Sequence, residues 1–308
     1  PEWGAFFSKK GQGRETPMPA PDDLEAWKAV QAANDAAKEG AADNKAAAFG
    51  VTYEESELGG IPVVKVTPSK LASTDKIAVY THGGAYVLNS PKAVIEAAMF
   101  FAAETGLRVI AVEYTLAPHS KWQETTDEVI SVFNALAKQG FTADDIVLYG
   151  DSAGGGLAAG VTLKMRDLGM EMPAVLVLWS PWADISETGD TYATLRDAEP
   201  YYTYEHVLGP SALAYADVED HKNPYVSPVY GDFKQGFPPT LIQGGTKELF
   251  LSNFVRLYQA LDQAGQKVKL DIYEGMPHVF VPSLPETAES QAAIAKVRDW
   301  VSEHLLDD

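Results

Sequence analysis

The chain has 308 residues, of which 46% are hydrophobic and 10% aromatic, so it can bury a large core and is unlike a disordered or fibrous protein. Its 43 acidic and 24 basic residues give a net charge of −19, which argues against nucleic acid and anionic membranes as partners. There is no cysteine, which excludes disulfides, thiolate catalysis and cysteine-bound metals, and no apolar run approaches the roughly 18 residues of a membrane span.

The N-terminal part of the sequence predicts an irregular arm followed by helices. Residues 1–20 are rich in Gly, Pro and Lys and predict an irregular arm. Pro21-Asp22-Asp23 predicts a helix start, and Trp27 follows at helical spacing. The alanine-rich stretch 34–48 predicts helix plus loop. From residue 50 the periodicity changes, and 51–53 with 61–66 predict a β-hairpin around Gly59-Gly60.

Beyond the hairpin, short apolar runs alternate with helical patterns. The runs cover residues 76–80, 108–112, 146–149, 175–179, 240–243 and 268–273, and the helical patterns cover about 91–105, 122–139, 154–168, 252–264 and 286–305. Continuous apolar strands separated by helices indicate an α/β fold with a mostly parallel sheet covered on both faces.

One stretch interrupts this alternation. Residues 183–238 are rich in Tyr and Pro and far longer than an ordinary crossover, so they predict an inserted cap. The expected organisation is an N-terminal cap segment at 1–49, a catalytic core at 50–182 and 239–308, and the cap insertion between its two parts.

A candidate nucleophile lies between a strand and a helix. Gly150-Asp151-Ser152-Ala153-Gly154 fits G-x-S-x-G, a pattern that arises by chance in roughly one chain in ten of this size. Its context makes the pattern specific, because an apolar strand precedes it and a Gly-rich helix start follows it. Such an elbow strains the serine backbone, needs small neighbours and aims a helix N-terminus at the hydroxyl. The alternative is a serine in a Gly-rich turn without chemistry.

A second glycine motif follows the strand at 76–80. In His82-Gly83-Gly84-Ala85-Tyr86, adjacent glycines would let main-chain N–H groups face a ligand and stabilise an oxyanion. The expected donors are the amides of Gly83, Gly84 and Ala153, and His82 is expected to brace the loop. A plain Gly-Gly turn is the alternative.

With these motifs, residues 50–308 resemble the hormone-sensitive-lipase-like family of bacterial esterases. The resemblance rests on His82-Gly83-Gly84, on Gly150 to Gly155, on Ser180-Pro181-Trp182-Ala183-Asp184 and on Tyr114-Thr115-Leu116-Ala117-Pro118. It implies an α/β-hydrolase fold with an eight-stranded sheet, hydrolysis of short-chain carboxylic esters, no metal or other cofactor, and a cap built from the N-terminal helices and the insertion.

The chain departs from the family pattern at four positions. Ala85 replaces a glycine of the oxyanion motif, Thr115 replaces an arginine and His119 a glutamate, and Glu248 stands where an aspartate acid is usual. The replacement at Thr115 leaves open what holds the Tyr114 loop.

The acid and the base are expected at the ends of the last two strands, because in this fold the triad runs Ser, Asp/Glu, His along the chain. Of six histidines, only His278 follows the strand 268–273 in a loop. Glu248 follows the strand 240–243, and it would accept the imidazole Nδ1–H and fix its tautomer. In the alternative assignment, Asp271 or Glu274 is the acid.

Substrate contacts are expected from the cap and from the loops near the elbow. The candidates are Trp27, Tyr86, Leu88, Tyr192, Leu195, Tyr201, Tyr202, Val279 and Phe280. Together they predict an apolar pocket for a small-molecule ester, and nothing basic is obviously placed for a charged substrate. A homodimer stays open, as does the compartment, with the cytoplasm slightly favoured.

Two other functions compete with ester hydrolysis. An amidase, lactonase or arylformamidase could use the same triad, although esters are the default because an alkoxide departs more easily than an amine. A non-catalytic receptor on this scaffold typically lacks the catalytic His, whereas His278 is retained here.

Overall fold

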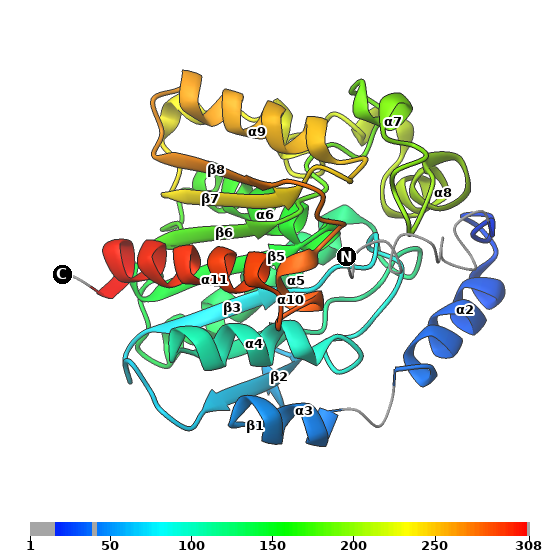
Figure 1. The fold of residues 1–308 in the computed structure, drawn as a ribbon. Helices are drawn as coiled ribbons and strands as arrows, with labels where there is room; N and C mark the ends of the chain where they lie inside the picture. The colour runs from blue at the N-terminus through cyan, green and yellow to red at the C-terminus, as the bar shows by residue number, and fades with distance from the viewer. Residues whose placement is uncertain (1–15, 39–41, 307–308) are drawn as a thin grey trace.

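The structure, a computed structural model, describes residues 16–38 and 42–306. The arm predicted at residues 1–20 therefore lies outside the described residues up to residue 15. A single eight-stranded sheet forms the centre of the described chain (Figure 1). Its strands are β1 (Val51–Leu58), β2 (Ile61–Pro68), β3 (Ile77–Thr81), β4 (Arg108–Val112), β5 (Ile146–Asp151), β6 (Val175–Trp179), β7 (Thr240–Gly245) and β8 (Val268–Tyr273).

The sheet is mostly parallel. Its order is β1-β2-β4-β3-β5-β6-β7-β8, and β2 pairs antiparallel with both β1 and β4 while all other pairings are parallel. The central strands β3, β5, β6 and β7 are buried along their whole length, which is why they read as continuous apolar runs. Parallel pairing brings the carboxyl ends of these strands to one edge of the sheet.

Helices cover both faces. The helices outside the segment between β6 and β7 are α2 (Leu24–Ala36), α3 (Ala42–Phe49), α4 (Ile95–Thr105), α5 (Trp122–Lys138), α6 (Ala153–Asp167), α9 (Leu251–Gln263), α10 (Phe280–Ser283) and α11 (Ala288–Val301), with short turns η1 (Ala143–Asp145) and η6 (Ser302–Leu306). One core cluster joins the sheet to α5, α6 and α9, and a second joins it to α4 and α11. The predicted α/β class is confirmed.

Several predicted boundaries agree with the structure. The strands 108–112, 175–179 and 268–273 are found as predicted, and the hairpin turns at Gly59-Gly60. The helix predicted from residue 91 begins only at Ile95. A turn precedes it, in which the Ser90 hydroxyl accepts the N–H of Ala93. The helical spacing of this segment did not distinguish the turn from a first helical turn.

The segment between β6 and β7 contains only short elements. They are α7 (Thr191–Thr194), η2 (Tyr204–Leu208), α8 (Gly209–Tyr215), η3 (Val218–Asp220), η4 (Pro228–Tyr230) and η5 (Phe233–Gln235). Figure 1 shows α7 and α8 at the same end of the sheet as α2. In contrast, α3 packs against α4 and β1, and the ring centroids of Phe49 and Phe100 lie 5.8 Å apart. Within the N-terminal segment, then, α2 stands apart from the sheet and α3 lies against it.

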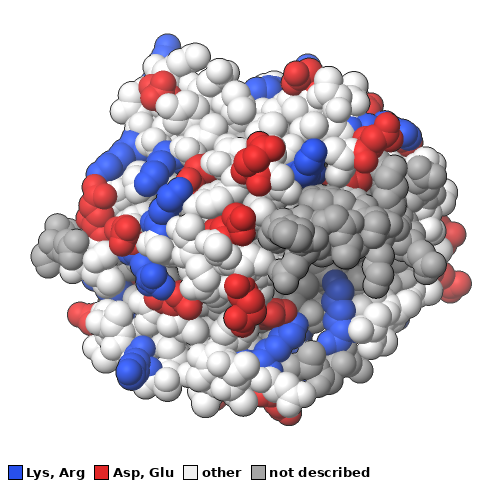
Figure 2. Space-filling view, in the orientation of Figure 1, with Lys and Arg blue, Asp and Glu red and all other residues white. Residues whose placement is uncertain are grey.

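The face drawn in Figure 2 carries both signs of charge, interspersed rather than gathered into one basic area. Several exposed groups are paired, such as Lys267 with Glu303 at 2.7 Å. Among the helices that the structure describes, none combines the length and the apolar character needed to cross a membrane.

Candidate active site

Ser152 lies at a sharp turn between β5 and α6. Its φ of 53° and ψ of −123° fall outside the regions that L-residues prefer, and its side chain is 8% exposed. The Ser152 N–H donates to the carbonyl of Trp179 at 2.9 Å, and its carbonyl accepts the N–H of Trp182 at 2.8 Å. A Cβ on Gly154 would come within 2.0 Å of the Thr81 carbonyl oxygen, so this turn of the chain needs glycine at that position.

Left-handed backbone conformations gather around this turn. Six non-glycine residues of the described chain have φ between 48° and 73°, and all lie in segments that follow β3, β5, β6 or β8: Ala85, Tyr86, Asn89, Ser152, Ser180 and Val279. Each such residue costs of order 1–3 kcal/mol unless its surroundings hold it. Strain of this kind concentrates at functional sites, and it marks this edge of the sheet.

Glu248 and His278 form a buried pair at the same edge. The His278 Nδ1–H donates to Oε2 of Glu248 at 2.7 Å, and the relative exposures of the two side chains are 9% and 0%. Oε1 of Glu248 accepts the N–H of Gly245 at 2.5 Å and the hydroxyl of Ser180 at 2.9 Å. Ser180 was part of a quoted motif, but sequence reasoning gave it no role, because its bond to Glu248 spans 68 positions of the chain.

The other two acids considered for this role lie elsewhere. Asp271 accepts from Gln243 Nε2 at 2.9 Å and pairs with Lys296. Glu274 is exposed and accepts the Thr246 hydroxyl at 3.4 Å. Within the described chain, neither carboxylate is bonded to His278.

The electrostatics of the pair favour a neutral imidazole. Burial lowers the pKa of His278 to about 4, although the charges of Glu199 and Asp151 oppose this shift. Burial also raises the pKa of Glu248, while the bonds from Gly245 and Ser180 favour its ionised form. Nδ1 points at a carboxylate, which can only accept, so the other ring nitrogen, Nε2, is free to take a proton.

The loop after β3 differs from the prediction at Gly83. Its N–H donates to Oδ1 of Asp151 at 3.0 Å, and Oδ1 also accepts the hydroxyl of Tyr80. The amide expected as an oxyanion donor is therefore occupied by a buried side chain. The N–H groups of Gly84 and Ala85 donate to none of the residues that the structure describes. Ala153 is the first residue of α6, where helix N–H groups lack intrahelical partners.

Contacts between His82 and Tyr114 hold this loop in place. Their rings stack with centroids 4.3 Å apart, and the Tyr114 hydroxyl donates to the His82 carbonyl at 2.7 Å. The Tyr114 loop itself is held by Glu128, which accepts both the N–H and the hydroxyl of Thr115 at 2.7 and 2.6 Å. Thr115 thus replaces the usual arginine with a different anchor.

Aromatic side chains form a continuous row beside the pair. Tyr215 stacks on Tyr86 at 3.7 Å, Tyr86 on Trp182 at 5.8 Å, and Trp182 on Phe250 at 5.6 Å. The edges of Phe250 and Tyr202 meet the His278 ring at 5.3 and 5.1 Å. Two predicted pocket residues, Tyr86 and Tyr202, belong to this row.

The remaining pocket candidates divide between the site and the core. Val279 follows His278 and donates its N–H to Ser180 Oγ at 3.0 Å, and Tyr192 meets Phe250 edge-on at 6.3 Å. Leu88 and Leu195 are partly buried and pack against the core cluster, whereas Tyr201 is exposed on the surface.

Two candidates are core residues instead. Phe280 is fully buried in the cluster of α4 and α11 and packs on Tyr273, so its side chain lies in the core and its role in the pocket stays a prediction. Trp27 is also fully buried, and its Nε1 donates to the carbonyl of Ala20 at 2.9 Å.

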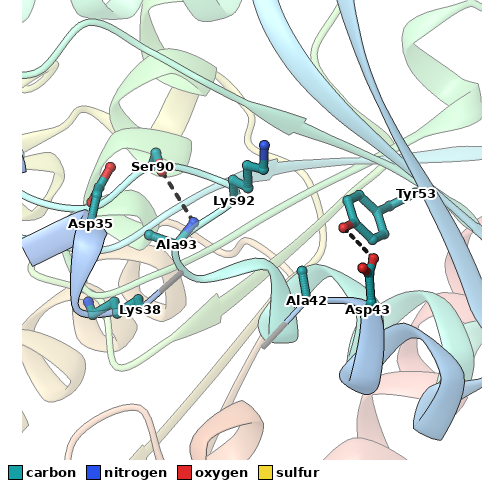
Figure 3. A pocket seen from close by; sticks show the side chains of 8 residues that line it. All are labelled: Asp35, Lys38, Ala42, Asp43, Tyr53, Ser90, Lys92 and Ala93. Carbon is teal, nitrogen blue, oxygen red and sulfur yellow. Dashed lines mark hydrogen bonds between the residues drawn. The ribbon is translucent and has the colours of Figure 1, made fainter. Parts of the chain in front are cut away.

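Two of the hollows near the end of α2 bear on the site. One, of about 160 Å³, is lined by Asp35, Lys38, Asp43, Tyr53 and neighbours and has no member of the Glu248–His278 pair in its wall (Figure 3). The other, of about 390 Å³, is lined in part by Asp151 and Val279, the sequence neighbours of Ser152 and His278.

Lys38 and Lys45 also line that second hollow, contrary to the expectation that nothing basic is near. Both cations have partners: Lys38 bonds Asn89, and Lys45 pairs with Glu96. No group of three His, Asp or Glu side chains in the described chain is arranged to hold a metal ion.

Comparison with known proteins gives the family. A profile of the α/β-hydrolase fold family matches residues 78–282. An acetyl-hydrolase of Streptomyces hygroscopicus is 34% identical over 211 residues, which is 68% of this chain and 70% of that protein.

Solved structures agree. The esterase E25 superposes with a TM-score of 0.89 at 33% identity, covering 99% of this chain and 94% of that one. An esterase of the bacterial hormone-sensitive lipase family superposes with a TM-score of 0.84 at 26% identity, covering 99% and 98%. The chain therefore belongs to the α/β-hydrolase fold family, and within it to the esterases related to hormone-sensitive lipase.

Proposed function

We propose that this serine carboxylesterase cleaves short-chain acyl esters through an acyl-enzyme formed on Ser152, with His278 as base and Glu248 as orienting acid. The observation that carries the assignment is the buried 2.7 Å bond from His278 Nδ1–H to Glu248, beside the strained elbow of Ser152. The bond fixes the tautomer in which Nε2 can accept a proton.

In the acylation step, His278 takes the Ser152 hydroxyl proton while Oγ attacks the ester carbonyl. The resulting imidazolium is stabilised by Glu248, which becomes its counterion. His278 then gives the proton to the departing alkoxide, and the alcohol leaves. Water repeats the same sequence on the acyl-enzyme and releases the carboxylic acid.

The oxyanion would be held by the amides of Gly84, Ala85 and Ala153. This set replaces the one containing Gly83, because the Gly83 N–H already donates to Asp151. Left-handed φ values of 128° at Gly84 and 54° at Ala85 turn this stretch of backbone sharply. Each donor aimed at a developing oxyanion contributes about 3 kcal/mol in the transition state.

The cap is proposed to consist of α2 and the 183–238 insertion, and α3 is left with the core. Gln31 of α2 donates to the carbonyls of Val87 and Ala117 at 3.0 and 3.1 Å, and Tyr215 of α8 stacks on Tyr86. The aromatic row would give the substrate an apolar wall, which suits small acyl groups. The acetyl-hydrolase relative supports the short-chain preference.

Ser152→Ala tests this function. Hydrolysis of p-nitrophenyl acetate is expected to vanish while the far-ultraviolet circular dichroism is retained, because the elbow accepts a small residue. Ser131→Ala, which removes a hydroxyl bonded to the Asp127 carbonyl on α5, is the matched control and should keep full activity. An organophosphate should label Ser152, and mass spectrometry placing the adduct on another residue would contradict the proposal.

A further inference from the structure

Glu199 is a buried acid that the mechanism above does not use. The described chain buries five acidic side chains: Asp151, Asp184, Glu199, Glu248 and Asp271. Asp184 pairs with Arg256 at 2.6 Å, and Asp271 pairs with Lys296. Glu199 is 0% exposed, and unlike Asp184 and Asp271 it forms no ion pair with a Lys or Arg of the described residues.

The partners of Glu199 are two backbone amides. Its Oε1 accepts the N–H of Tyr201 at 3.0 Å, and its Oε2 accepts the N–H of Leu249 at 3.4 Å. Leu249 follows Glu248 directly, so this contact joins the insertion to the loop that carries the triad acid. An ionised carboxylate buried with only two such donors is costly, and proteins rarely keep one without a use.

The group that can become positive near Glu199 is His278. The charge of His278 favours the ionised form of Glu199, and the charge of Glu199 in turn opposes the loss of a proton from His278. The other titratable groups facing the two residues are Glu248 from the β7–α9 loop and Asp151 at the elbow. Tyr201 and Tyr202 lie next to Glu199 on its own segment, and the charge of Glu199 contributes to the raised pKa of both tyrosines.

We propose that Glu199 is a positioning residue of ester hydrolysis: its negative charge stabilises the His278 imidazolium formed at each proton transfer, and its bond to the Leu249 amide holds the Glu248 loop. The inference rests on the proposed function, since it assumes that His278 is the base. Glu199 touches neither substrate nor reacting atoms, and it acts only through these two partners.

With Glu199 in this role, the rate depends on the ionisation of the Glu199 carboxyl as well as on that of His278. Burial raises the pKa of Glu199 to about 7, with the charge of His278 opposing this shift and that of Glu248 adding to it. Above that pH the carboxylate is charged and supports the imidazolium. Below it the carboxyl is neutral and the support is lost. Activity should therefore rise once as His278 loses its proton and again near neutral pH.

Glu199→Gln tests the proposal because it removes the charge and keeps the shape. At about pH 8.5 we expect kcat to fall about tenfold with KM changed less than about twofold, which corresponds to one unit of imidazole pKa. At about pH 5.5, where the wild-type carboxyl is neutral, the two enzymes should differ by less than about twofold. Glu199→Asp keeps the charge and should keep the second rise. Glu219→Gln, an exposed glutamate of the same insertion, is the control and should follow the wild type.

A structural role alone would lower kcat equally at every pH, and that result, or an unchanged kcat, would overturn the proposal. Should Glu199→Gln fail to fold by circular dichroism, the wild-type profile decides, because a single ionisation between about pH 4 and 9 contradicts a second titrating carboxyl. The two failures are distinguishable. A wild-type protein that neither turns over esters nor takes an organophosphate on Ser152 refutes the proposed function, whereas normal labelling with a pH-independent ratio refutes only the role of Glu199.

Discussion

The hydroxyl of Ser180 donates a hydrogen bond to Oε1 of Glu248 at 2.9 Å. The hydroxyl oxygen of Ser180 also accepts the N–H of Val279 at 3.0 Å, so one side chain on the loop after β6 joins the loops of the acid and of the base. Ser180 has a left-handed φ of 48° in this position. Such a strained backbone conformation persists because the surrounding contacts hold it.

Removing that hydroxyl should weaken catalysis. Ser180→Ala takes one donor from a buried carboxylate, a bond worth about 1.5–3 kcal/mol, so kcat should fall by about ten- to a hundredfold with little change in KM. Steady-state kinetics on p-nitrophenyl acetate measure this, with Ser131→Ala as the control. A wild-type kcat in Ser180→Ala would show that Gly245 and His278 alone hold Glu248.

The identity of the acid is tested by a pair of variants. Glu248→Gln should lower kcat by orders of magnitude, on the order of 10⁴ where the orienting carboxylate of such a triad is neutralised. Asp271→Asn should change kcat by less than about threefold, since Asp271 bonds Lys296 and Gln243 and not His278. The reverse ranking of the two variants would move the acid to Asp271.

His82 should make stability depend on acid pH. Burial lowers its pKa to about 4 from the ordinary 6.5, so the unfolded chain binds a proton that the folded chain does not. The stabilising contribution of neutral His82 is thus complete above pH 6.5 and is lost as the pH falls toward 4. Between about pH 7 and 4.5 the advantage of wild type over His82→Asn should shrink by roughly 2–3 kcal/mol.

Urea unfolding of both proteins at the two pH values measures that difference. The comparison between variants is needed because the buried acids Glu248 and Glu199 have raised pKa values. As the pH falls, their protonation stabilises the folded protein in the same range, and this contribution is common to both variants. A constant gap between wild type and His82→Asn would mean that His82 is protonated in the folded protein at the lower pH.

The α2 helix should affect turnover through Gln31. Its side chain donates to the Val87 and Ala117 carbonyls and meets His119 Nε2 at 3.1 Å, so it ties α2 to the loops after β3 and β4. Gln31→Ala should lower kcat/KM several-fold, while Lys28→Ala on the exposed side of the same helix should not. Equal activity of both variants would show that the Gln31 contacts of α2 do not contribute to turnover.

The sequence was most informative where burial leaves little choice. The strand at 175–179 was predicted residue for residue, because a run of Val, Leu and Trp buried on both sides permits few alternatives. Ser152, Glu248 and His278 could be named because each follows a strand in the order that the fold requires. Their roles stay predictions, although the structure brings Glu248 and His278 into contact.

What sequence reasoning missed depends on contacts between distant segments. Nothing in the sequence indicates that the Gly83 amide meets Asp151, or that Glu199 accepts the Leu249 amide, since these pairs are 68 and 50 positions apart. The same limit explains Phe280, which follows Val279 but points into the opposite core cluster. A change of direction over one residue of loop has no signature in composition or periodicity.

The bond between Val279 and Ser180 has a consequence for how the enzyme folds. It closes a loop of 99 positions, and with Glu248 it joins the ends of three strands that are synthesised far apart in time. Contacts of such long range form late, because the entropy of closing the chain must be lost before they stabilise anything. Recovery of ester hydrolysis after dilution from denaturant should therefore follow the slowest refolding phase rather than the appearance of secondary structure, and a nascent chain that ends before β8 should be inactive however much of its sheet has formed.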